Sequence, residues 1–302
     1  MSRLHDLEKK SIDILKSFEP LDDSYFICYS GGKDSDVIRI LAELANVKHE
    51  LHYNLTTVDA PETVYYIKSI PNIHIDVNYY PDGQRKTMTN LIPNKLTPPT
   101  RLKRYCCAEL KEGNGKGRLL VTGVRWAESK NREESRDFLQ SLNKPKNTMK
   151  YLDSLGIGYK VTKKGGIAFD YDNEVLRDDK DILQHCYKTR SVSINPIVDW
   201  LDSDVWEFLN YYGCKANPIY QCGFKRVGCV GCPLGGEKSM KREFHLYPKY
   251  MNIYIHAFDR MLKKRAEKNK PTVWKSGEEV FNWWIEADTD QLLFDDFSYL
   301  DV

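Results

Sequence analysis

The stretch Ser24-Tyr-Phe-Ile-Cys-Tyr-Ser-Gly-Gly-Lys-Asp-Ser35 decides the fold of this 302-residue chain. Its first half is rich in residues that favour strands, and the helical spacing of Val37, Ile38 and Leu41 follows it. Two glycines between a strand and a helix let backbone N–H groups face a ligand, and the amino end of the helix adds a partial positive charge. The stretch therefore predicts a strand, a phosphate-binding turn and a helix that begins at about Ser35.

Strands and helices continue to alternate after this stretch. Residues 51–58 have the composition of a strand and precede a helix that we expect over residues 61–70, with Pro61 at its first position. Residues 73–80 and 118–124 are further strand candidates. Such alternation indicates an α/β fold with a doubly wound, mostly parallel, Rossmann-like sheet.

The regular pattern weakens towards the carboxyl end. We expect a nucleotide-binding α/β domain over residues 1–212, interrupted by an irregular insertion at about residues 141–190, and an irregular, mostly helical, cysteine-containing region over residues 213–302. The charge of this last region is uneven, because segment 260–275 has a net charge of +6 and residues 276–302 a net charge of −8. A solvated helix with an acidic tail packed against it is one interpretation, and a basic face for a polyanion is the other.

The overall composition is that of an ordinary globular protein. Apolar residues make up 41% and charged residues 29% of the chain, and the formal net charge is +2. These values exclude a disordered chain, a collagen-like fibre and a disulfide-dense mini-protein. No apolar run approaches the ~20 residues that span a bilayer, and the amino-terminal residues lack the apolar core of a secretory signal. We therefore expect a cytoplasmic protein with reduced thiols and no membrane partner.

Eight cysteines are the unusual feature of the composition. Cys229 and Cys232 have the Cys-x-x-Cys spacing of a metal knuckle, and Cys106 and Cys107 are adjacent. Two adjacent thiolates rarely serve one zinc ion, whereas they can reach separate corners of a larger iron–sulfur cluster. Zinc and a set of free buried thiols stay as alternatives. The other four cysteines are reserve ligands, Cys186 and Cys222, and expected structural thiols, Cys28 and Cys214.

Polar residues after the strand candidate at 118–124 are expected to face the cleft of the glycine turn, because ligands bind at the carboxyl ends of parallel strands. Arg125 is the candidate for binding a phosphate or sulfonate through its planar guanidinium, and a local pair between Arg125 and Glu128 is the alternative. Asp59 is a candidate for ribose or base contact, with an acidic helix cap as the alternative. The predicted nucleotide-binding residues are Ser30, Gly31, Gly32, Lys33, Asp34, Ser35, Asp59, Gly123, Arg125, Glu128, Ser129 and Arg132.

Several motifs resemble one known family, in the same order along the chain. The sequence SGGKDS at residues 30–35 resembles the pyrophosphate loop (PP-loop) of the adenine-nucleotide α-hydrolase superfamily, whose members include ATP pyrophosphatases. The resemblance covers about residues 24–260 and implies an α/β fold of that type. The motifs similar to those of its phosphoadenosine phosphosulfate (PAPS) reductase family are Arg104-Tyr-Cys-Cys107 with Lys111, Thr122-Gly-Val-Arg-Trp-Ala-Glu-Ser129 with Arg132, Asn195-Pro-Ile-Val-Asp-Trp200 with Asp204-Val-Trp206, and Lys225-Arg-Val-Gly-Cys-Val-Gly-Cys-Pro-Leu234.

The resemblance implies a nucleotide site and a metal cluster. Members of the superfamily typically bind ATP with Mg²⁺ and release pyrophosphate, so Lys33, Asp34 and Arg125 are the implied catalytic residues. Relatives that act on adenylyl sulfate hold a [4Fe–4S] cluster with a tandem cysteine pair and a Cys-x-x-Cys motif. Carried onto this chain, and with zinc as the alternative, the implied ligands are Cys106, Cys107, Cys229 and Cys232.

One departure from the family pattern bears on the reaction. Sulfonucleotide reductases of the family use a redox cysteine close to the C-terminus, but the last cysteine here is Cys232 and the 70 residues after it contain none. The double glycine of the loop is typical of ATP-cleaving members. We therefore expect ATP pyrophosphatase, adenylating chemistry coupled to sulfur transfer.

Its expected acceptor is a nucleic acid, either tRNA or DNA, and its expected donor is a cysteine desulfurase or a thioredoxin-like protein. Two alternatives stay open. The first is reduction of PAPS or adenylyl sulfate through another thiol such as Cys222. The second is a non-catalytic, nucleotide-binding partner protein.

Overall fold

Five parallel strands build the sheet that positions the glycine-rich stretch. In the computed structural model they lie in the order β3-β2-β1-β4-β8, and Phe26 of β1 pairs with Glu50 of β2 on one side and Leu120 of β4 on the other. The strands are β1 (Tyr25–Cys28), β2 (His49–Asn54), β3 (Ile73–Asp76), β4 (Leu119–Val121) and β8 (Val192–Ile194). The predicted α/β class with a mostly parallel, doubly wound sheet is confirmed.

The structure describes residues 3–101, 103–112, 114–128, 139–141, 159–161, 167–169 and 192–286. Within the stretch predicted as an irregular insertion and just before it, three short strands extend the sheet from β8 in antiparallel fashion, in the order β5-β7-β6. They are β5 (Leu139–Ser141), β6 (Tyr159–Val161) and β7 (Ile167–Phe169).

The chain forms two compact units that interleave along the sequence. Unit 1 comprises residues 1–53, 62–75 and 114–227, and unit 2 comprises residues 54–61, 76–113 and 228–302. The division at residue 212 that we expect from the sequence stays a prediction. Among the described residues, no helix combines the length and the apolar character that crossing a membrane requires.

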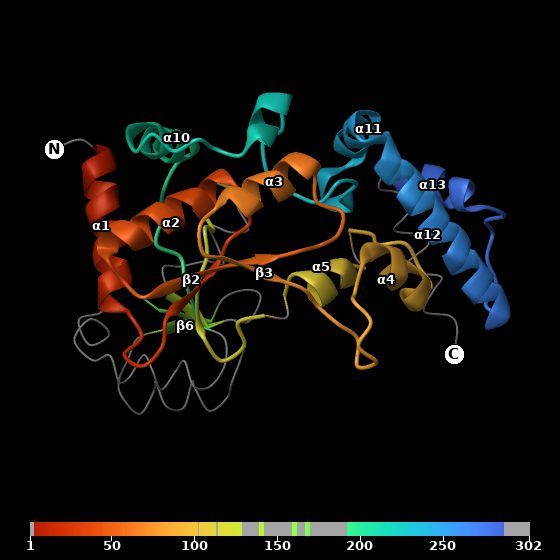
Figure 1. Cartoon of the computed structure of the whole chain (residues 1–302), viewed down its shortest axis with the longest axis horizontal. Coiled ribbons are helices and arrows are strands. Elements are labelled where there is room, and N and C mark those ends of the chain that lie inside the picture. The colour runs from red at the N-terminus through yellow and green to blue at the C-terminus, as the bar shows by residue number, and fades with distance from the viewer. Residues whose placement is uncertain are drawn as a thin grey trace. The chain divides into compact units, whose positions relative to one another are not determined.

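Unit 1 contains the sheet and the helices packed on it. Helix α2 contacts β1 and lies against α1 and α10, as Figure 1 shows. Apolar residues of β1 and α2, among them Ile27, Val37 and Leu41, are almost completely buried. The helices are α1 (Arg3–Ser17), α2 (Lys33–Ala45), α3 (Pro61–Ser69) and α10 (Asp202–Tyr211).

Unit 2 is mostly helical around an aromatic core. The ring of Trp284 packs against Tyr254 and Phe258, and its indole N–H donates to the carbonyl of Pro99 at 2.6 Å. Helices α12 and α13 lie side by side (Figure 1). The helices are α4 (Met88–Lys95), α5 (Tyr105–Leu110), α11 (Glu237–Leu246), α12 (Pro248–Glu267) and α13 (Gly277–Ile285).

Several element boundaries differ from the sequence prediction. Helix α2 begins at Lys33 rather than at about Ser35, because Gly32 already takes the extended conformation of a helix N-cap, with φ −93° and ψ 160°. Strand β2 ends at Asn54, four residues earlier than predicted. The chain leaves the sheet there, because Thr57 has a left-handed φ of 69° that no strand can accommodate.

Candidate functional site

The glycine loop, residues 30–35, connects the carboxyl end of β1 to the first turn of α2. Gly31 has a φ of +73°, and a Cβ atom there would lie 2.9 Å from Cδ1 of Ile67. The left-handed backbone conformation therefore favours glycine at this position. The loop lies at the edge of the sheet where parallel strands end, which is where α/β proteins bind ligands.

Two residues distant in sequence hold the glycine loop in place. The buried side-chain amide of Asn217 donates to the carbonyl of Gly31 at 3.0 Å and to Oγ1 of Thr63 at 3.1 Å. The hydroxyl of Tyr220 accepts a hydrogen bond from the amide of Lys33 at 2.8 Å. Our sequence reasoning missed both residues. The pair Asn217-Pro218 was the available signal, because Asn followed by Pro is typical of a helix start, and Asn217 does cap the short helix Pro218–Cys222.

Four charged side chains form a closed network beside the glycine loop. Arg125 Nε lies 2.7 Å from Oδ1 of Asp34, and Arg125 Nη2 lies 2.9 Å from Oδ1 of Asp202. Lys33 Nζ lies 3.4 Å from Asp34 and 3.1 Å from Asp202. Two cations and two carboxylates thus neutralise one another, and the cations are the enclosed members, since the side chains of Lys33 and Arg125 are only 8% and 2% exposed.

Asp202 is a further functional candidate that sequence reasoning missed. It is the first residue of α10, and 64% of its side chain is exposed. Partial burial opposes its ionisation, but hydrogen bonds and charge from Lys33 and Arg125 together hold the pKa of Asp202 below its usual value. Asp202 is therefore an ionised carboxylate on the solvent-exposed side of the network.

The segment after β4 brings the other predicted residues of unit 1 to this network. A Cβ atom at Gly123 would lie 3.0 Å from Cβ of Asp34, so the segment passes close to the first turn of α2. The carboxylate of Glu128 accepts a hydrogen bond from the backbone amide of Arg125 at 3.2 Å, rather than pairing with its guanidinium. Ser129 and Arg132 lie outside the described residues.

Asp59 belongs to unit 2 and not to the unit of the glycine loop. Its carboxylate accepts a hydrogen bond from the amide of Thr56 at 2.9 Å, and its backbone forms a β-bridge with Cys229. The contacts of Asp59 therefore fix the loop between β2 and α3 beside one of the predicted metal ligands. Its assignment to ribose or base stays a prediction.

The four predicted metal ligands, here called the thiol cluster, come together in unit 2. Cys106 and Cys107 lie in the first turn of α5, and Cys229 and Cys232 lie in the loop before the short helix Pro233–Gly235. The hydrogen bond to Cys107 and burial are the main causes that raise the pKa of the Cys106 thiol. The nearby charges of Cys107, Cys229 and Cys232 raise this pKa further. The four sulfur atoms are therefore near enough to influence one another's ionisation.

Positive charge accompanies these thiols. The hydrogen bond from Cys106, together with Arg104 and Lys111, lowers the pKa of Cys107 against the effect of burial. Proximity to Cys229 raises the pKa of Lys111. Burial raises the pKa of Cys229, an effect that Lys111 opposes. The surroundings therefore combine restricted solvent access with cations that stabilise thiolates.

A buried carboxylate shapes the knuckle between Cys229 and Cys232. The carboxylate of Glu243 on α11 accepts from the amide of Gly231 at 2.7 Å and from the hydroxyl of Ser239 at 2.7 Å. Gly231 has a φ of +72°, and a Cβ atom there would run into the ring of Phe244. Glycine and Glu243 together fix the turn. Sequence reasoning missed Glu243, because a single glutamate in a helix is an ordinary feature.

Three of the four remaining cysteines belong to a different unit from the thiol cluster. Cys28, Cys214 and Cys222 all belong to unit 1, where Cys28 ends β1 and Cys222 is exposed. Cys214 follows α10, and its sulfur is 3.8 Å from Nη2 of Arg39. Cys186 falls outside the described residues.

A family model for the phosphoadenosine phosphosulfate reductase domain matches residues 24–234. The chain belongs to this family. The matched range includes the glycine loop, Arg125 and all four residues of the thiol cluster. The resemblance that the sequence motifs carry is therefore confirmed at the level of the PAPS reductase family.

Relatives of this PAPS reductase-family chain include proteins with and without a known reaction. An uncharacterized protein of Methanocaldococcus jannaschii is 25% identical over 85% of this chain and 54% of its own length, so the chain spans about half of that relative. Phosphoadenosine 5'-phosphosulfate reductase of Xylella fastidiosa is 24% identical over 59% of this chain and 68% of its own length. The crystal structure of PAPS reductase from Candida auris in its phosphate complex superimposes with a TM-score of 0.41 and 14% identity, covering 76% of this chain and 96% of that one.

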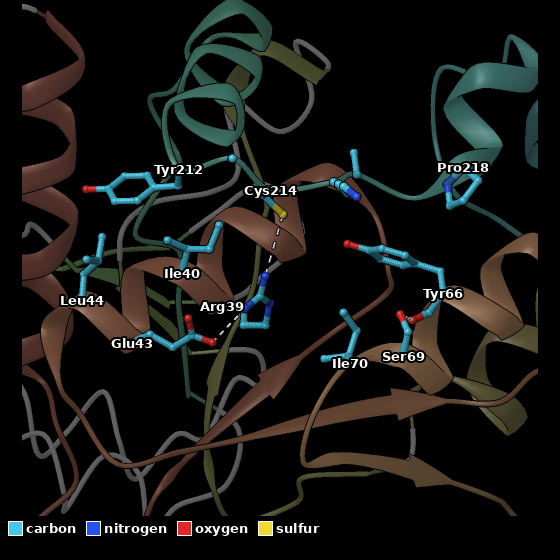
Figure 2. Close-up of a pocket in the computed structure, with 13 residues that line it drawn as sticks. Arg39, Ile40, Glu43, Leu44, Tyr66, Ser69, Ile70, Tyr212, Cys214 and Pro218 are labelled. Atoms are coloured by element: carbon cyan, nitrogen blue, oxygen red, sulfur yellow. Dashed lines mark hydrogen bonds and ion pairs between the residues drawn. The ribbon is translucent and has the colours of Figure 1, made fainter.

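The PAPS reductase-family chain also has a cavity of about 750 Å³ in unit 1. Figure 2 shows Arg39 at its centre, between Glu43, Tyr66 and Cys214. Among the described residues, its lining shares no member with the predicted nucleotide site. Its wall includes residues 212–216 and Pro218, so the segment that borders the cavity continues into Tyr220, which holds the glycine loop.

Proposed function

We propose that this chain cleaves ATP to AMP and pyrophosphate and uses the activated intermediate to transfer sulfur to an acceptor. The observation that carries the proposal is the charge network of Lys33, Arg125, Asp34 and Asp202. A nucleoside triphosphate with Mg²⁺ supplies a partner for the cations of the network and a partner for its carboxylates. Its phosphates take the two cations, and its metal ion takes carboxylate oxygens, the ligands that Mg²⁺ prefers.

The need to replace the ion-pair partners of both the cations and the carboxylates favours a metal-bound triphosphate over other anions. A phosphate or sulfonate without a metal would pair with Lys33 and Arg125 and leave the charges of Asp34 and Asp202 without partners. Asp202 can move aside at small cost because its side chain is 64% exposed. Asp34 is 21% exposed, so its charge needs a replacement when the cations turn to phosphate.

The proposed reaction has two steps. An oxygen of the acceptor attacks the α-phosphorus, an acceptor–phosphorus bond forms, and the bond between the α-phosphorus and the bridging oxygen breaks to release pyrophosphate. Hydrosulfide supplied by a sulfur donor then attacks the activated carbon, and AMP leaves with the acceptor oxygen. Lys33 and Arg125 neutralise the negative charge that builds up on the phosphates in the first step, and the amino end of α2 adds to this effect.

The thiol cluster has the donor set of an iron–sulfur site. Four cysteines supply four thiolates, and Arg104 and Lys111 offset part of their charge. The adjacent pair Cys106 and Cys107 in the first turn of α5 supports a [4Fe–4S] cluster over zinc, because adjacent thiolates can reach separate corners of a cluster. With Cys229 and Cys232 they would hold a cluster that supplies electron transfer or carries sulfur.

A nucleic acid is the proposed acceptor, because unit 2 carries a basic segment. Helix α12 and the residues after it contain seven basic residues and one acidic residue between Arg260 and Lys275. Lys264 and Arg265 bind Asn94 and the carbonyl of Leu96. The exposed basic residues are Arg260, Lys263, Lys268, Lys270 and Lys275. Such a surface binds phosphate backbones through charge.

Pyrophosphate release tests the proposal. The anaerobically purified chain, given MgATP, sulfide and bulk tRNA or DNA, should release pyrophosphate, and Lys33→Ala should lower the rate at least 100-fold. Lys10→Ala is the matched control, because Lys10 pairs with Asp199 in the same unit but is not part of the network. A wild-type protein that binds ATP without turnover would instead indicate a non-catalytic nucleotide-binding partner.

Reduction of a sulfonucleotide is the second candidate. It is favoured by Cys222, an exposed thiol two residues after the tyrosine that contacts the amide of Lys33. An accessible cysteine near an anion site can attack the sulfur of PAPS or adenylyl sulfate. Sulfite formation from either compound with reduced thioredoxin, abolished in Cys222→Ser, would replace the ATP-cleaving assignment.

A further inference from the structure

We propose that Glu50, His52 and His74 form a binding site for a divalent transition metal on the sheet of unit 1. Glu50 and His52 are two residues apart on β2, so they point to the same face of the sheet. His74 lies on β3, the neighbouring strand at the edge of the sheet. The three potential ligand atoms lie within 4.8 Å of one another.

Aromatic stacking already holds the two imidazole rings in parallel. The ring of His52 stacks on Phe26 of β1, with the centroids 3.8 Å apart and an angle of 12° between the planes. The ring of His74 stacks on His52 at 4.8 Å and 15°. The nitrogen lone pairs lie in the ring planes, so ligation of one ion by both rings requires His74, which is at an exposed position, to tilt out of the stack.

The carboxylate is also held in place for this role. Glu50 Oε2 lies 3.2 Å from Nε2 of His52 and 2.6 Å from Nη1 of Arg118, and Oε1 accepts from the hydroxyl of Ser24 at 3.1 Å. Hydrogen bonds to a ligating carboxylate orient it towards the ion, which is the role that outer residues commonly have at metal sites.

Among the described residues, the guanidinium of Arg118 opposes a cation here, and its charge is partly neutralised. Arg118 Nη2 lies 3.4 Å from the carboxylate of Asp23 and 2.7 Å from the hydroxyl of Ser24. These contacts hold the guanidinium on the side of β1 and the residues before it. His74 lies on the other neighbour of β2, on an exposed position where water can complete the coordination of the ion.

The donor set selects the class of metal. Two imidazole nitrogens and one carboxylate oxygen suit Zn²⁺, Co²⁺, Ni²⁺ and Cu²⁺, whereas Mg²⁺ and Ca²⁺ prefer oxygen ligands alone. An ion bound here would connect the edge strand β3 to β2. It would therefore stabilise unit 1 independently of the nucleotide site and of the thiol cluster.

Titration with Co²⁺ tests the site, because cobalt reports its ligands by absorption. The full chain, with its thiols already occupied by reconstituted iron and sulfide, should bind one further Co²⁺. Its spectrum should show ligand-field bands without the intense sulfur-to-cobalt charge-transfer bands of thiolate ligation. His74→Gln should weaken this binding at least tenfold, and Glu50→Gln should do the same.

His49→Gln is the matched control, because His49 lies on the same strand but its Nδ1 contacts the carbonyl of Val47. It should bind Co²⁺ as the wild-type chain does. A second readout is thermal stability: Zn²⁺ should raise the unfolding midpoint of wild-type protein and of His49→Gln, but not of His74→Gln. Equal Co²⁺ affinity in the wild-type chain and His74→Gln, or Co²⁺ uptake only with thiolate bands, would overturn the proposal.

Discussion

The glycine-loop network of unit 1 and the thiol cluster of unit 2 differ in how their charged groups are paired. In unit 1, Lys33 and Arg125 are matched by Asp34 and Asp202, so the network is balanced without any ligand. In unit 2, four thiols face two cations, Arg104 and Lys111, and burial raises the pKa of Cys229. A balanced network exchanges partners with an incoming ligand, whereas clustered thiols become anionic ligands when a metal group replaces their protons.

Removing one thiol should give the largest effect, because it deletes one of the four proposed ligands of the cluster. We expect anaerobically purified wild-type protein to contain stoichiometric iron and labile sulfide, and Cys229→Ser to lose most of both. Iron and sulfide analysis measures this directly. Cys222→Ser is the control, since Cys222 is exposed and belongs to unit 1, and it should keep the metal content of wild-type protein. Zinc without iron in the wild-type chain would contradict the cluster.

Removing one cation from the charge network of unit 1 should affect both the free energy of unfolding and turnover. Arg125→Gln leaves Asp34 and Asp202 with Lys33 as their remaining cationic partner. Since Asp202 is mostly exposed, we expect a loss of about 2 kcal/mol in the free energy of unfolding, less than a fully buried pair would cost. Pyrophosphate release should fall about 100-fold. Lys241→Gln is the control, because it removes an exposed i,i+4 pair with Glu237 and should leave stability nearly unchanged. A similar loss in both variants would show that the network is not special.

Asp36 is an exception to the balance of unit 1, and it makes stability depend on pH. It is completely buried and accepts a hydrogen bond from the hydroxyl of Tyr29, and burial raises the pKa of Asp36 to about 6. Between pH 4 and 6 the unfolded chain has lost this proton while the folded protein keeps it, so this group lowers stability as the pH rises. The difference amounts to about 3 kcal/mol at pH 7.

Asp36→Asn removes that titration while retaining an acceptor for Tyr29. Urea unfolding at pH 4 and pH 7 should show that the variant gains about 3 kcal/mol relative to wild-type protein over this range. Parallel stabilities of the two proteins across the range would mean that Asp36 is ionised in the folded state without penalty.

The smallest expected effect concerns the support of the glycine loop. Asn217→Ala removes the hydrogen bonds to the carbonyl of Gly31 and to Thr63, and should lower the free energy of unfolding by about 1–2 kcal/mol. Because the loop loses its anchor, the affinity for ATP should fall as well. Asn210→Ala, at an exposed position of α10, should change stability by less than about 0.5 kcal/mol. Equal effects of the two changes would remove Asn217 from the site.

Much of the fold could be predicted because its signals are local. The β1 strand, the glycine loop and α2 follow one another within about 20 residues, and Pro61 does begin α3. The boundaries that failed depend on contacts from elsewhere. Strand β2 was predicted to reach residue 58, but a left-handed Thr57 and the hydrogen bond between Asp59 and the amide of Thr56 fold the chain away from the sheet.

The residues of the candidate sites also divide into those with a local sequence signal and those that depend on distant contacts. The sequence pointed to Lys33, Arg125 and the four cysteines, because their residue types and spacing are typical of anion and metal sites. It did not point to Asp202, Tyr220 or Glu243, whose types and spacing are ordinary. Their importance comes from neighbours that no periodic pattern encodes, as when the hydroxyl of Tyr220 meets an amide 187 residues away in the chain.

The sequence by itself therefore determined the local features of this protein: a glycine turn whose left-handed φ favours a residue without a Cβ, and a Cys-x-x-Cys spacing. The tertiary structure decided which charges oppose one another. Arg125 meets Asp34 and Asp202 across 91 and 77 residues, and Cys106 and Cys107 meet Cys229 and Cys232 only when unit 2 assembles. The physical reason is that backbone preferences act over a few residues, whereas ion pairs and ligand sets depend on which distant segments the fold brings together.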